Sequence, residues 1–261
     1  MSLTRMYGVI VRIMFNLRHS LDRAADMFYW PATDLVLWGL TSLYFSTLSA
    51  ETQSASVPIL AGVLLWTVVH RGQQEVSISV LEELWNRNLV NLFVTPLTIG
   101  ELVASYFLVG IVKGVISFAV ASAIAYGLYA FNITFFGLHL IPFIFLLLMC
   151  GWWMGLIIAA FIMRYGTRVQ TLAWTLAWVF SPFSAIYFPV SVLPEWAQVV
   201  AEAVPSSYVF EAARTYISSG LIDYRTLGVS FALSLVYIVL ALLFFRSSFR
   251  VVLDRGLVKL N

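Results

Sequence analysis

The sequence has very little charge for its length. Of its 261 residues, 61% are hydrophobic and only 11% are charged, and the mean hydropathy is +0.90. A soluble domain has roughly 25% charged residues. A shortfall this large means that most of the surface does not face water, which excludes an ordinary soluble domain. We therefore expect an all-α membrane protein in which one helical bundle takes up most of the chain.

Residues that hold metals, form disulfides or bind nucleotides are also scarce. The single cysteine, Cys150, excludes an intrachain disulfide. The three histidines, His19, His70 and His139, lie far apart in the expected topology, so no metal site is expected. The phosphate-binding loop GxxxxGK[ST] does not occur, and neither do GxSxG and HExxH. We therefore do not expect an enzyme, nor ATP hydrolysis by this chain through that loop.

Six segments are apolar enough to be considered as membrane spans, which need about 20 residues each. They are residues 31–49, 57–79, 98–130, 137–163, 168–188 and 226–245. The second is the least regular, because its apolar part, Val57 to Val69, continues into a polar run. Pro31 suits the first position of a helix, whereas Pro182 inside the fifth segment predicts a kink or break.

Cations lie mainly on one side of this six-span arrangement. Eleven of them share a side with both termini: Arg5, Arg12, Arg18, Arg23, Arg87, Arg164, Arg168, Arg246, Arg250, Arg255 and Lys259. The opposite side has only Arg214 and Arg225. The positive-inside rule then places both termini in the cytoplasm. The expected location is a cell membrane, of the bacterial plasma or inner membrane type.

The N-terminal residues 1–29 form a separate unit before the six-helix domain, residues 30–261. Apolar residues recur there at steps of three and four: Leu3, Met6, Ile10, Ile13, Leu17 and Leu21. Arg12, Asn16, His19 and Arg23 share another face. This pattern predicts an amphipathic helix in the membrane interface. A cytosolic helix packed on the rest of the protein is the alternative.

Two connections between the expected spans are too long to be simple turns. On the cytoplasmic side, Leu81, Trp85, Leu89 and Leu92 form one apolar stripe and Pro96 ends the element, which predicts a short amphipathic helix at about 81–95. On the outer side, residues of about 189–222 contain two short helices, and the stretch from Pro182 to Pro205 is too apolar for an ordinary loop. We expect a broken, re-entrant hairpin there. Its marker residues are Pro182, Pro189, Pro194, Trp196 and Pro205.

Five polar or charged side chains fall at or within expected spans. They are Asp34, Arg71, Gln74, Glu75 and Lys113. A charge at a helix centre costs about 2.5–3.5 kcal/mol on insertion scales, so each needs a reason. Arg71 and Glu75 are four residues apart and can pair on one helix face. One reading is the lining of a transport path, with Lys113 near a dimer seam. The other is structural pairing, in which Lys113 meets Asp34 or Glu75.

Two GxxxG pairs are further features of the spans. Gly110 and Gly114 form one pair, and Gly151 and Gly155 form the other. Each pair predicts a place where two helix backbones approach closely.

Three segments together carry a family resemblance. They read MFYWPATDLVLWGL, LEELWNRNLVNLFVTPLTIGELVASY and FSPFSAIYFPVSVLPEWAQVVAEAVPSSYVFEAAR, and the last is the most specific through its P-S-S-Y-x-x-E-A-x-R run. With the span layout, they resemble the membrane subunit of a type-two ABC exporter, the group that includes drug, nodulation-factor and glycolipid export permeases. The sequence looks closer to the drug and nodulation-factor branch.

The resemblance implies a pump of two permease copies, expected to be a homodimer, and two ATPase subunits. ATP and Mg would be bound by the partner ATPase, with no cofactor on this chain and no nucleic acid as partner. Residues 82–93 would contact the ATPase through Glu82, Glu83, Trp85, Asn86, Arg87, Asn88 and Phe93. The substrate would be amphipathic, lipid-linked or drug-like.

Three other functions remain open at this point. An ion-coupled secondary transporter would use Lys113, Asp34 and Glu75 as coupling groups. A polysaccharide or glycolipid exporter would keep the ABC architecture with another substrate. A membrane enzyme acting on lipid would need a catalytic cluster, which the sequence does not offer.

Overall fold

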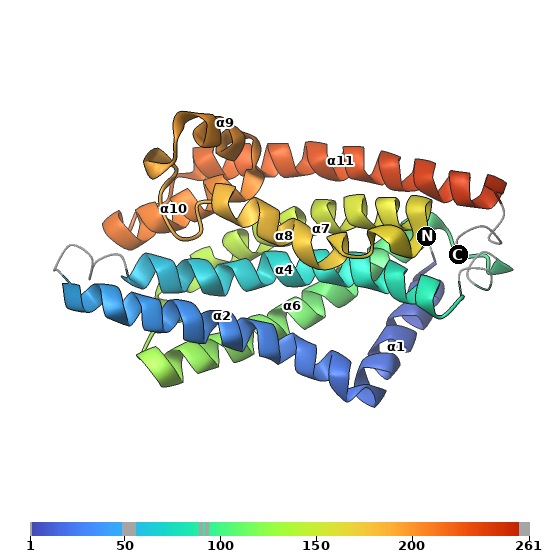
Figure 1. Ribbon diagram of the computed structural model, residues 1–261, viewed down its shortest axis with the longest axis horizontal. Coiled ribbons are helices and arrows are strands. Elements are labelled where there is room, and N and C mark those ends of the chain that lie inside the picture. The colour runs from blue at the N-terminus through green and yellow to red at the C-terminus, as the bar shows by residue number, and fades with distance from the viewer. Residues whose placement is uncertain (1, 49–55, 89–90, 92–93, 256–261) are drawn as a thin grey trace.

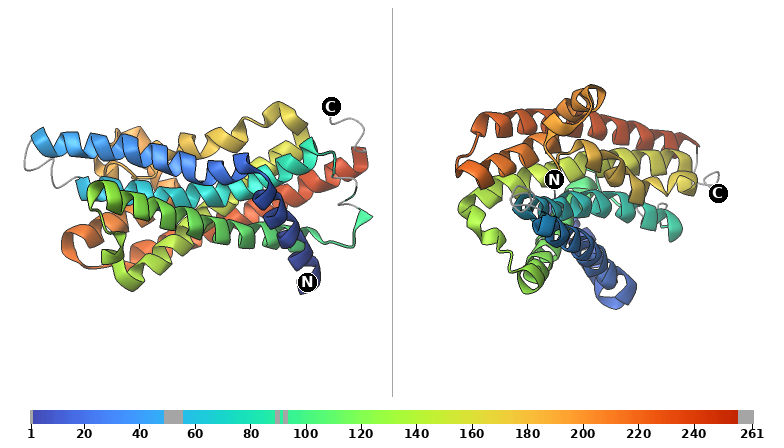
Figure 2. Two further views of the ribbon diagram at one scale, coloured as in Figure 1. Left: turned by 90° about the horizontal axis from the view of Figure 1, so that it is seen from below. Right: turned by 60° about the vertical axis from the view of Figure 1, so that its left-hand side comes forward.

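The computed structural model describes residues 2–48, 56–88, 91 and 94–255, and within these ranges it contains helices and no strand. The long helices are α2 (Leu21–Leu48), α4 (Ser56–Trp85), α6 (Ile99–Tyr129), α7 (Leu140–Tyr165) and α11 (Tyr224–Arg255). They run along the long axis of the molecule, with α4 between α2 and α7 (Figure 1). The helix α1 (Leu3–His19) crosses them at one end, which we call the α1 end (Figure 2).

Three helical segments are long and apolar enough to cross a membrane: Ile99–Tyr129, Ile133–Val169 and Tyr224–Val252. They coincide with the third, fourth and sixth expected spans. The helices α2 and α4 occupy the first two but carry more polar residues, and the apolar segment at the fifth, Leu172–Phe183, is short. The count of six spans therefore stays a prediction.

The first two helices divide at a different place from the one the sequence suggested. A break at Ser20 ends α1, and residues 21–29 belong to α2. Pro31 lies inside α2 instead of opening it, so that expectation was wrong. Proline leaves the carbonyl of the residue four positions earlier without its N–H donor. Here that carbonyl, on Met27, accepts a hydrogen bond of 3.1 Å from Ser117 Oγ of α6.

The central helix α4 is buried along most of its length and continues to Trp85. Residues 81–85 therefore extend α4, and the prediction that a separate short helix begins at about residue 81 was wrong. Arg87, in the turn that follows, has a left-handed backbone with φ of 51°. Leu89, Leu92 and Phe93 lie outside the described residues. The helix α6 then begins after a capping box formed by Thr98 and Glu101.

One of the two GxxxG pairs brings helix backbones together, as predicted. A Cβ atom added at Gly151 would lie 2.5 Å from the carbonyl oxygen of Val69, and one at Gly155 would lie 2.7 Å from that of Gln73. The helix α7 thus lies directly on α4. The other pair does not bring backbones together. A Cβ atom added at Gly110 would lie 3.5 Å from its nearest neighbour, and one at Gly114 would lie 3.7 Å from its nearest neighbour, which are ordinary contact distances.

The hairpin after the fifth expected span is broken, as Pro182 predicted. The helix α8 (Leu172–Phe180) ends in a 3-10 turn that contains Pro182. Pro194 and Pro205 then mark the starts of α9 (Glu195–Ala203) and α10 (Pro205–Ser219). Ala185 inside the break has φ of 58°. Both short helices lie at the end of the molecule opposite α1 (Figure 1).

Candidate functional site

A charged face runs along α4 from the middle of the bundle to the α1 end. Arg71, Glu75, Ser79 and Glu83 follow one another at steps of four, so they share one side of the helix. All four residues are buried. Because buried charges are expensive unless paired, the partners of this face come from the helices packed on it.

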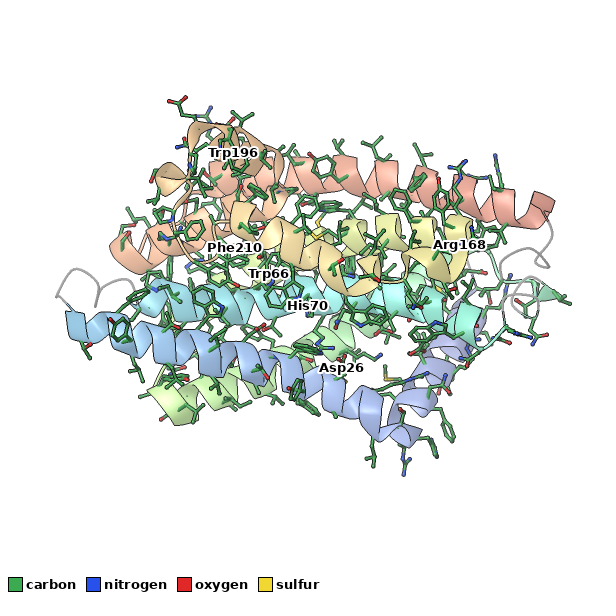
Figure 3. The ribbon with its side chains drawn as sticks, viewed as in Figure 1. Asp26, Trp66, His70, Arg168, Trp196 and Phe210 are labelled. Atoms are coloured by element: carbon green, nitrogen blue, oxygen red, sulfur yellow. The ribbon has the colours of Figure 1, made fainter. Side chains whose placement is uncertain are left out.

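The first partner is Asp26 on α2. Arg71 Nη1 lies 3.0 Å from Asp26 Oδ2, and Nη2 donates to the backbone carbonyl of the same residue. Figure 3 shows Asp26 on the part of α2 that faces α4. Arg71 thus pairs with another helix, whereas the sequence suggested Glu75 four residues on.

Glu75 pairs instead with Lys113 of α6. Lys113 Nζ lies 2.6 Å from Glu75 Oε2, and Ser79 Oγ donates to the other carboxylate oxygen at 3.1 Å. The Glu75 side chain is 6% exposed and that of Lys113 is 17% exposed. Of the two structural partners considered for Lys113, Asp34 and Glu75, the structure thus pairs it with Glu75. The positive charge of Lys113 is therefore balanced by the carboxylate of Glu75 in this conformation.

The other two polar residues of the expected spans are placed differently. Asp34 is half-buried on α2 and makes no ion pair with any residue in the described ranges. Gln74 is buried on α4, and its side-chain oxygen has no hydrogen-bond partner among the described atoms. The structure therefore joins Lys113 and Glu75, and leaves Asp34 and Gln74 apart from that pair.

Near the α1 end, the charged face meets α1 and the start of α2. Arg12 pairs with Glu83, and Arg23 Nε lies 3.1 Å from Glu82 Oε1. Glu82 lies beyond the expected end of the second span at residue 79. Burial raises the pKa of its carboxyl, and the neighbouring Arg23 opposes this rise.

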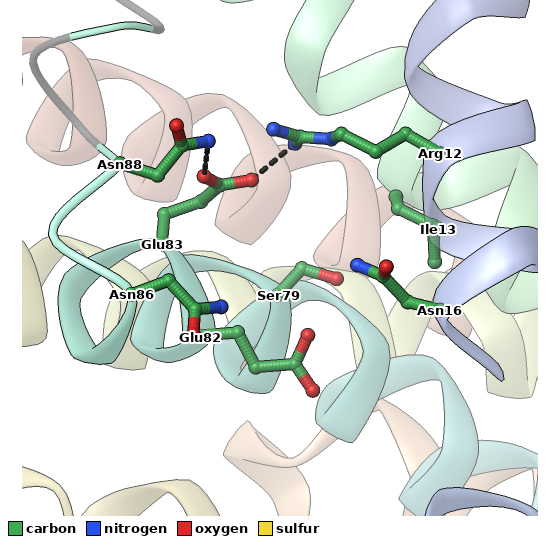
Figure 4. A pocket seen from close by; sticks show the side chains of 8 residues that line it. All are labelled: Arg12, Ile13, Asn16, Ser79, Glu82, Glu83, Asn86 and Asn88. Atoms are coloured by element: carbon green, nitrogen blue, oxygen red, sulfur yellow. Dashed lines mark hydrogen bonds and ion pairs between the residues drawn. The ribbon is translucent and has the colours of Figure 1, made fainter. Parts of the chain in front are cut away.

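A polar cavity of about 220 Å³ opens between these helices (Figure 4). It is lined by Arg12, Ile13, Asn16, Ser79, Glu82, Glu83, Asn86 and Asn88. Asn88 donates to Glu83 Oε2 at 2.6 Å. Of the two acidic residues expected as contacts for a partner, Glu83 is thus directed toward α1 and Glu82 toward the start of α2.

Trp85, Asn86 and Arg87, which were also expected to contact a partner, form a tip at the end of α4 and in the turn after it. Trp85 is half-exposed, stacks on Trp174 with ring centres 6.2 Å apart, and donates to Gln170 Oε1 at 3.2 Å. Asn86 and Arg87 are exposed. The described part of this tip therefore offers an indole, an amide and a guanidinium at the α1 end.

At the other end, two residues of the P-S-S-Y-x-x-E-A-x-R run hold the broken hairpin in place. Glu211 accepts a 2.7 Å hydrogen bond from the backbone N–H of Val190, directly after Pro189. Arg214 Nη2 donates to the Ala185 carbonyl at 3.0 Å, and its Nη1 lies 3.3 Å from Glu211 Oε1. Trp196, by contrast, is exposed at this end (Figure 3). Its ring and that of Phe183 are in a T-shaped arrangement with centroids 6.0 Å apart.

Sequence reasoning missed several partners in these sites. Asp26, Ser79 and Glu101 were not singled out. Each contacts a charged residue that the sequence analysis did name, respectively Arg71, Glu75 and Arg5. The acidic and basic residues of the P-S-S-Y-x-x-E-A-x-R run could have drawn attention to Glu211 and Arg214. For Asp26 and Ser79, the local pattern contains no comparable signal.

Comparison with known families gives one match. A family model described as ABC-2 type transporter matches residues 11–218, which is well over half of the chain. A search of curated proteins finds no match.

Proposed function

Because the chain belongs to the ABC-2 type transporter family, we propose that this permease subunit works in an ATP-driven exporter. Family membership implies that it associates with an ABC ATPase subunit. The export direction is part of the proposal, and so is an amphipathic, lipid-linked or drug-like substrate, as in the drug and nodulation-factor branch. Two ATPase copies, which would bind ATP and Mg, would act on two copies of this chain.

The proposed arrangement has six spans and places the α1 end in the cytoplasm. The spans would be α2, α4, α6, α7, α8 with the broken hairpin, and α11. The bias of eleven cations against two supports this orientation in a bacterial plasma or inner membrane. The hairpin held by Glu211 and Arg214 would then close the outer end of the path.

The observation that carries the proposal is the position of the exposed tip. Trp85, Asn86 and Arg87 lie where α4 ends, and α4 is a single helix of 30 residues buried through the bundle. A continuous packed helix transmits displacement along its axis because its core contacts are not freely deformable. An ATPase that moves this tip would therefore move the middle of the bundle, including Glu75 and its partner Lys113.

Reversing the exposed charge at the tip is expected to uncouple the ATPase. Arg87→Glu should lower ATP-driven export at least tenfold while the permease still inserts, because a carboxylate would oppose the partner surface that Arg87 complements. The measurement is export from cells or membrane vesicles that contain the chain and its ATPase. Arg225→Glu is the matched control: Arg225 is also an exposed arginine, but it lies at the opposite end. Equal export in both variants would count against the tip as the ATPase contact.

A second candidate function is ion-coupled transport. The observation that favours it is the buried pair of Lys113 and Glu75, because intramembrane ionisable residues commonly lie on ion or substrate pathways. We propose that these two, with Asp34, Arg71 and Gln74, border the path in either case. Export that continues on a proton gradient after ATP is depleted would favour the second function over the first.

A further inference from the structure

Two of the three arginines of α1, Arg5 and Arg12, are directed toward the rest of the protein and not toward the membrane surface. The opposite side of α1 presents an exposed apolar stripe at steps of four: Leu3, Tyr7, Val11 and Phe15. Arg5 and Arg12 instead reach acidic residues on α6 and α4. An interfacial helix whose arginines bind lipid headgroups would point them outward. Their task is therefore within the protein.

These contacts reach both ends of the connection between α4 and α6. Before the connection, Arg12 of α1 pairs with Glu83, and Arg23 at the start of α2 pairs with Glu82. After it, Arg5 donates to the carbonyl of Pro96 and lies 3.3 Å from Glu101 Oε2. The backbone N–H of Ser2 donates to Glu101 Oε1 at 2.6 Å. The helix α1 thus bridges the residues that enter and leave the connection.

One of these contacts extends into the turn itself. Glu83 accepts from Arg12 with one carboxylate oxygen and from Asn88 with the other (Figure 4). Asn88 in turn accepts from Asn91 at 2.9 Å. Replacing Arg12 would therefore alter the position of Glu83 and, through it, that of Asn88, the residue after Arg87.

We infer that Arg5 and Arg12 of α1, together with Arg23 at the start of α2, are positioning residues that fix the α4–α6 connection to the N-terminal helices, and so set where the ATPase contact stands relative to the membrane. The inference rests on the proposed function of the tip. Glu83 and Glu101 are buried at 8% and 1% exposure. The side chains of Arg5 and Arg12 are 40% and 35% exposed, so the pairs are partly open to solvent. Removing either arginine would still leave a buried carboxylate without its cation, which is unfavourable. Glu83 thereby binds α1 and Glu82 binds the start of α2, instead of the ATPase.

The first test measures release of the connection without any partner. Trypsin cleavage after Arg87, followed by mass spectrometry of the purified permease in detergent, reports how often this turn opens. Arg12→Glu, which places two carboxylates together, should be cut about tenfold faster than the wild type. Arg12→Glu combined with Glu83→Arg restores opposite charges, although Asn88 loses its acceptor, and should therefore slow cleavage after Arg87 relative to Arg12→Glu. Mass spectrometry separates this cleavage from that after the new arginine at position 83. Arg18→Glu is the matched control, because Arg18 is exposed on α1 and forms no ion pair with described residues.

The second test adds the ATPase and compares export with ATP hydrolysis. Arg12→Glu should reduce export per ATP hydrolysed at least fivefold, and the double exchange should recover most of it. Arg12→Gln, a milder change, guards against loss of folding in the reversed variant. Unchanged cleavage in Arg12→Glu and Arg12→Gln, or no recovery in the double exchange, would overturn the inference.

Faster cleavage with unchanged export per ATP would overturn the positioning role while leaving the contacts in place. A wild-type chain that never exports with an ABC ATPase would instead contradict the proposed function, and the cleavage assay would still decide whether α1 holds the connection.

Discussion

Gly155→Ala is expected to destabilise the permease strongly, whereas Gly114→Ala is not, although both glycines belong to GxxxG pairs. At Gly155 an added Cβ atom would lie 2.7 Å from the Gln73 carbonyl oxygen and 2.8 Å from Val76 Cβ. Because the first of these atoms is backbone, α7 and α4 would have to separate. Overpacking of this kind typically costs about 1–3 kcal/mol. We expect a value near the upper end, since both helices lie in the middle of the bundle.

The matched substitution, Gly114→Ala, should leave the stability of the permease unchanged or raise it. At Gly114 the nearest atom is the flexible Leu148 Cδ2 at 3.7 Å, so an alanine methyl group has room. Alanine also favours a helix over glycine by up to about 1 kcal/mol. Thermal unfolding in detergent, followed by tryptophan fluorescence, should show a lower Tm for Gly155→Ala and an unchanged or higher Tm for Gly114→Ala. Equal shifts in the two variants would mean that α7 does not lie directly on α4.

Lys113→Met is expected to remove most of the folded permease, because it leaves Glu75 buried without a cation. Breaking one partner of a buried ion pair typically costs about 3–5 kcal/mol. Lys113→Met combined with Glu75→Gln removes both charges at nearly constant volume. We expect this double variant to recover the folded fraction, as judged by a single symmetric peak in size-exclusion chromatography.

Export by the double variant separates the two roles of the pair. If Lys113 and Glu75 border the path, as proposed, the folded double variant should still export at least tenfold less than the wild type. Normal export would show that the pair only stabilises the bundle, which contradicts the path role. The control is Arg225→Gln, which removes an exposed charge at the start of α11.

The positions of the apolar helices could be predicted from the sequence because each depends on a local pattern. Residues 98–130 and 137–163 correspond to Ile99–Tyr129 and Leu140–Tyr165 within a few positions. Pro182 marked the break after α8 for a similarly local reason. The close contact at Gly151 and Gly155 also followed from spacing, but the spacing alone did not distinguish that pair from Gly110 and Gly114.

Features that depend on distant partners could not be predicted in this way. Pro31 looked like a helix start because the Ser117 hydroxyl that satisfies the Met27 carbonyl lies on another helix. Arg71 was matched to its helical neighbour Glu75, whereas its partner Asp26 lies on α2. A pattern along one helix contains no information about which side chains the neighbouring helices bring to it.

The partners of charged residues near the end of a long helix could not be predicted from the sequence. Glu82 and Glu83 stand beside an exposed turn, which favoured a solvent-facing site for a partner. Their partners, Arg23 and Arg12, come from a segment about sixty to seventy residues earlier. The contact proposed for the ATPase is therefore narrower than the sequence suggested, and centres on Trp85, Asn86 and Arg87.

The most direct measurement of the central claim is photo-crosslinking in intact cells from position 87. A photoreactive amino acid at residue 87 should form an adduct with a polypeptide that mass spectrometry identifies as an ABC ATPase. The same amino acid at residue 222, beside the start of α11 at the opposite end, should form none with that protein. If neither position 87 nor position 86 yields an ATPase adduct from a permease that is present in the membrane, or if position 222 yields it instead, this end of the chain is not where an ATPase drives the transporter.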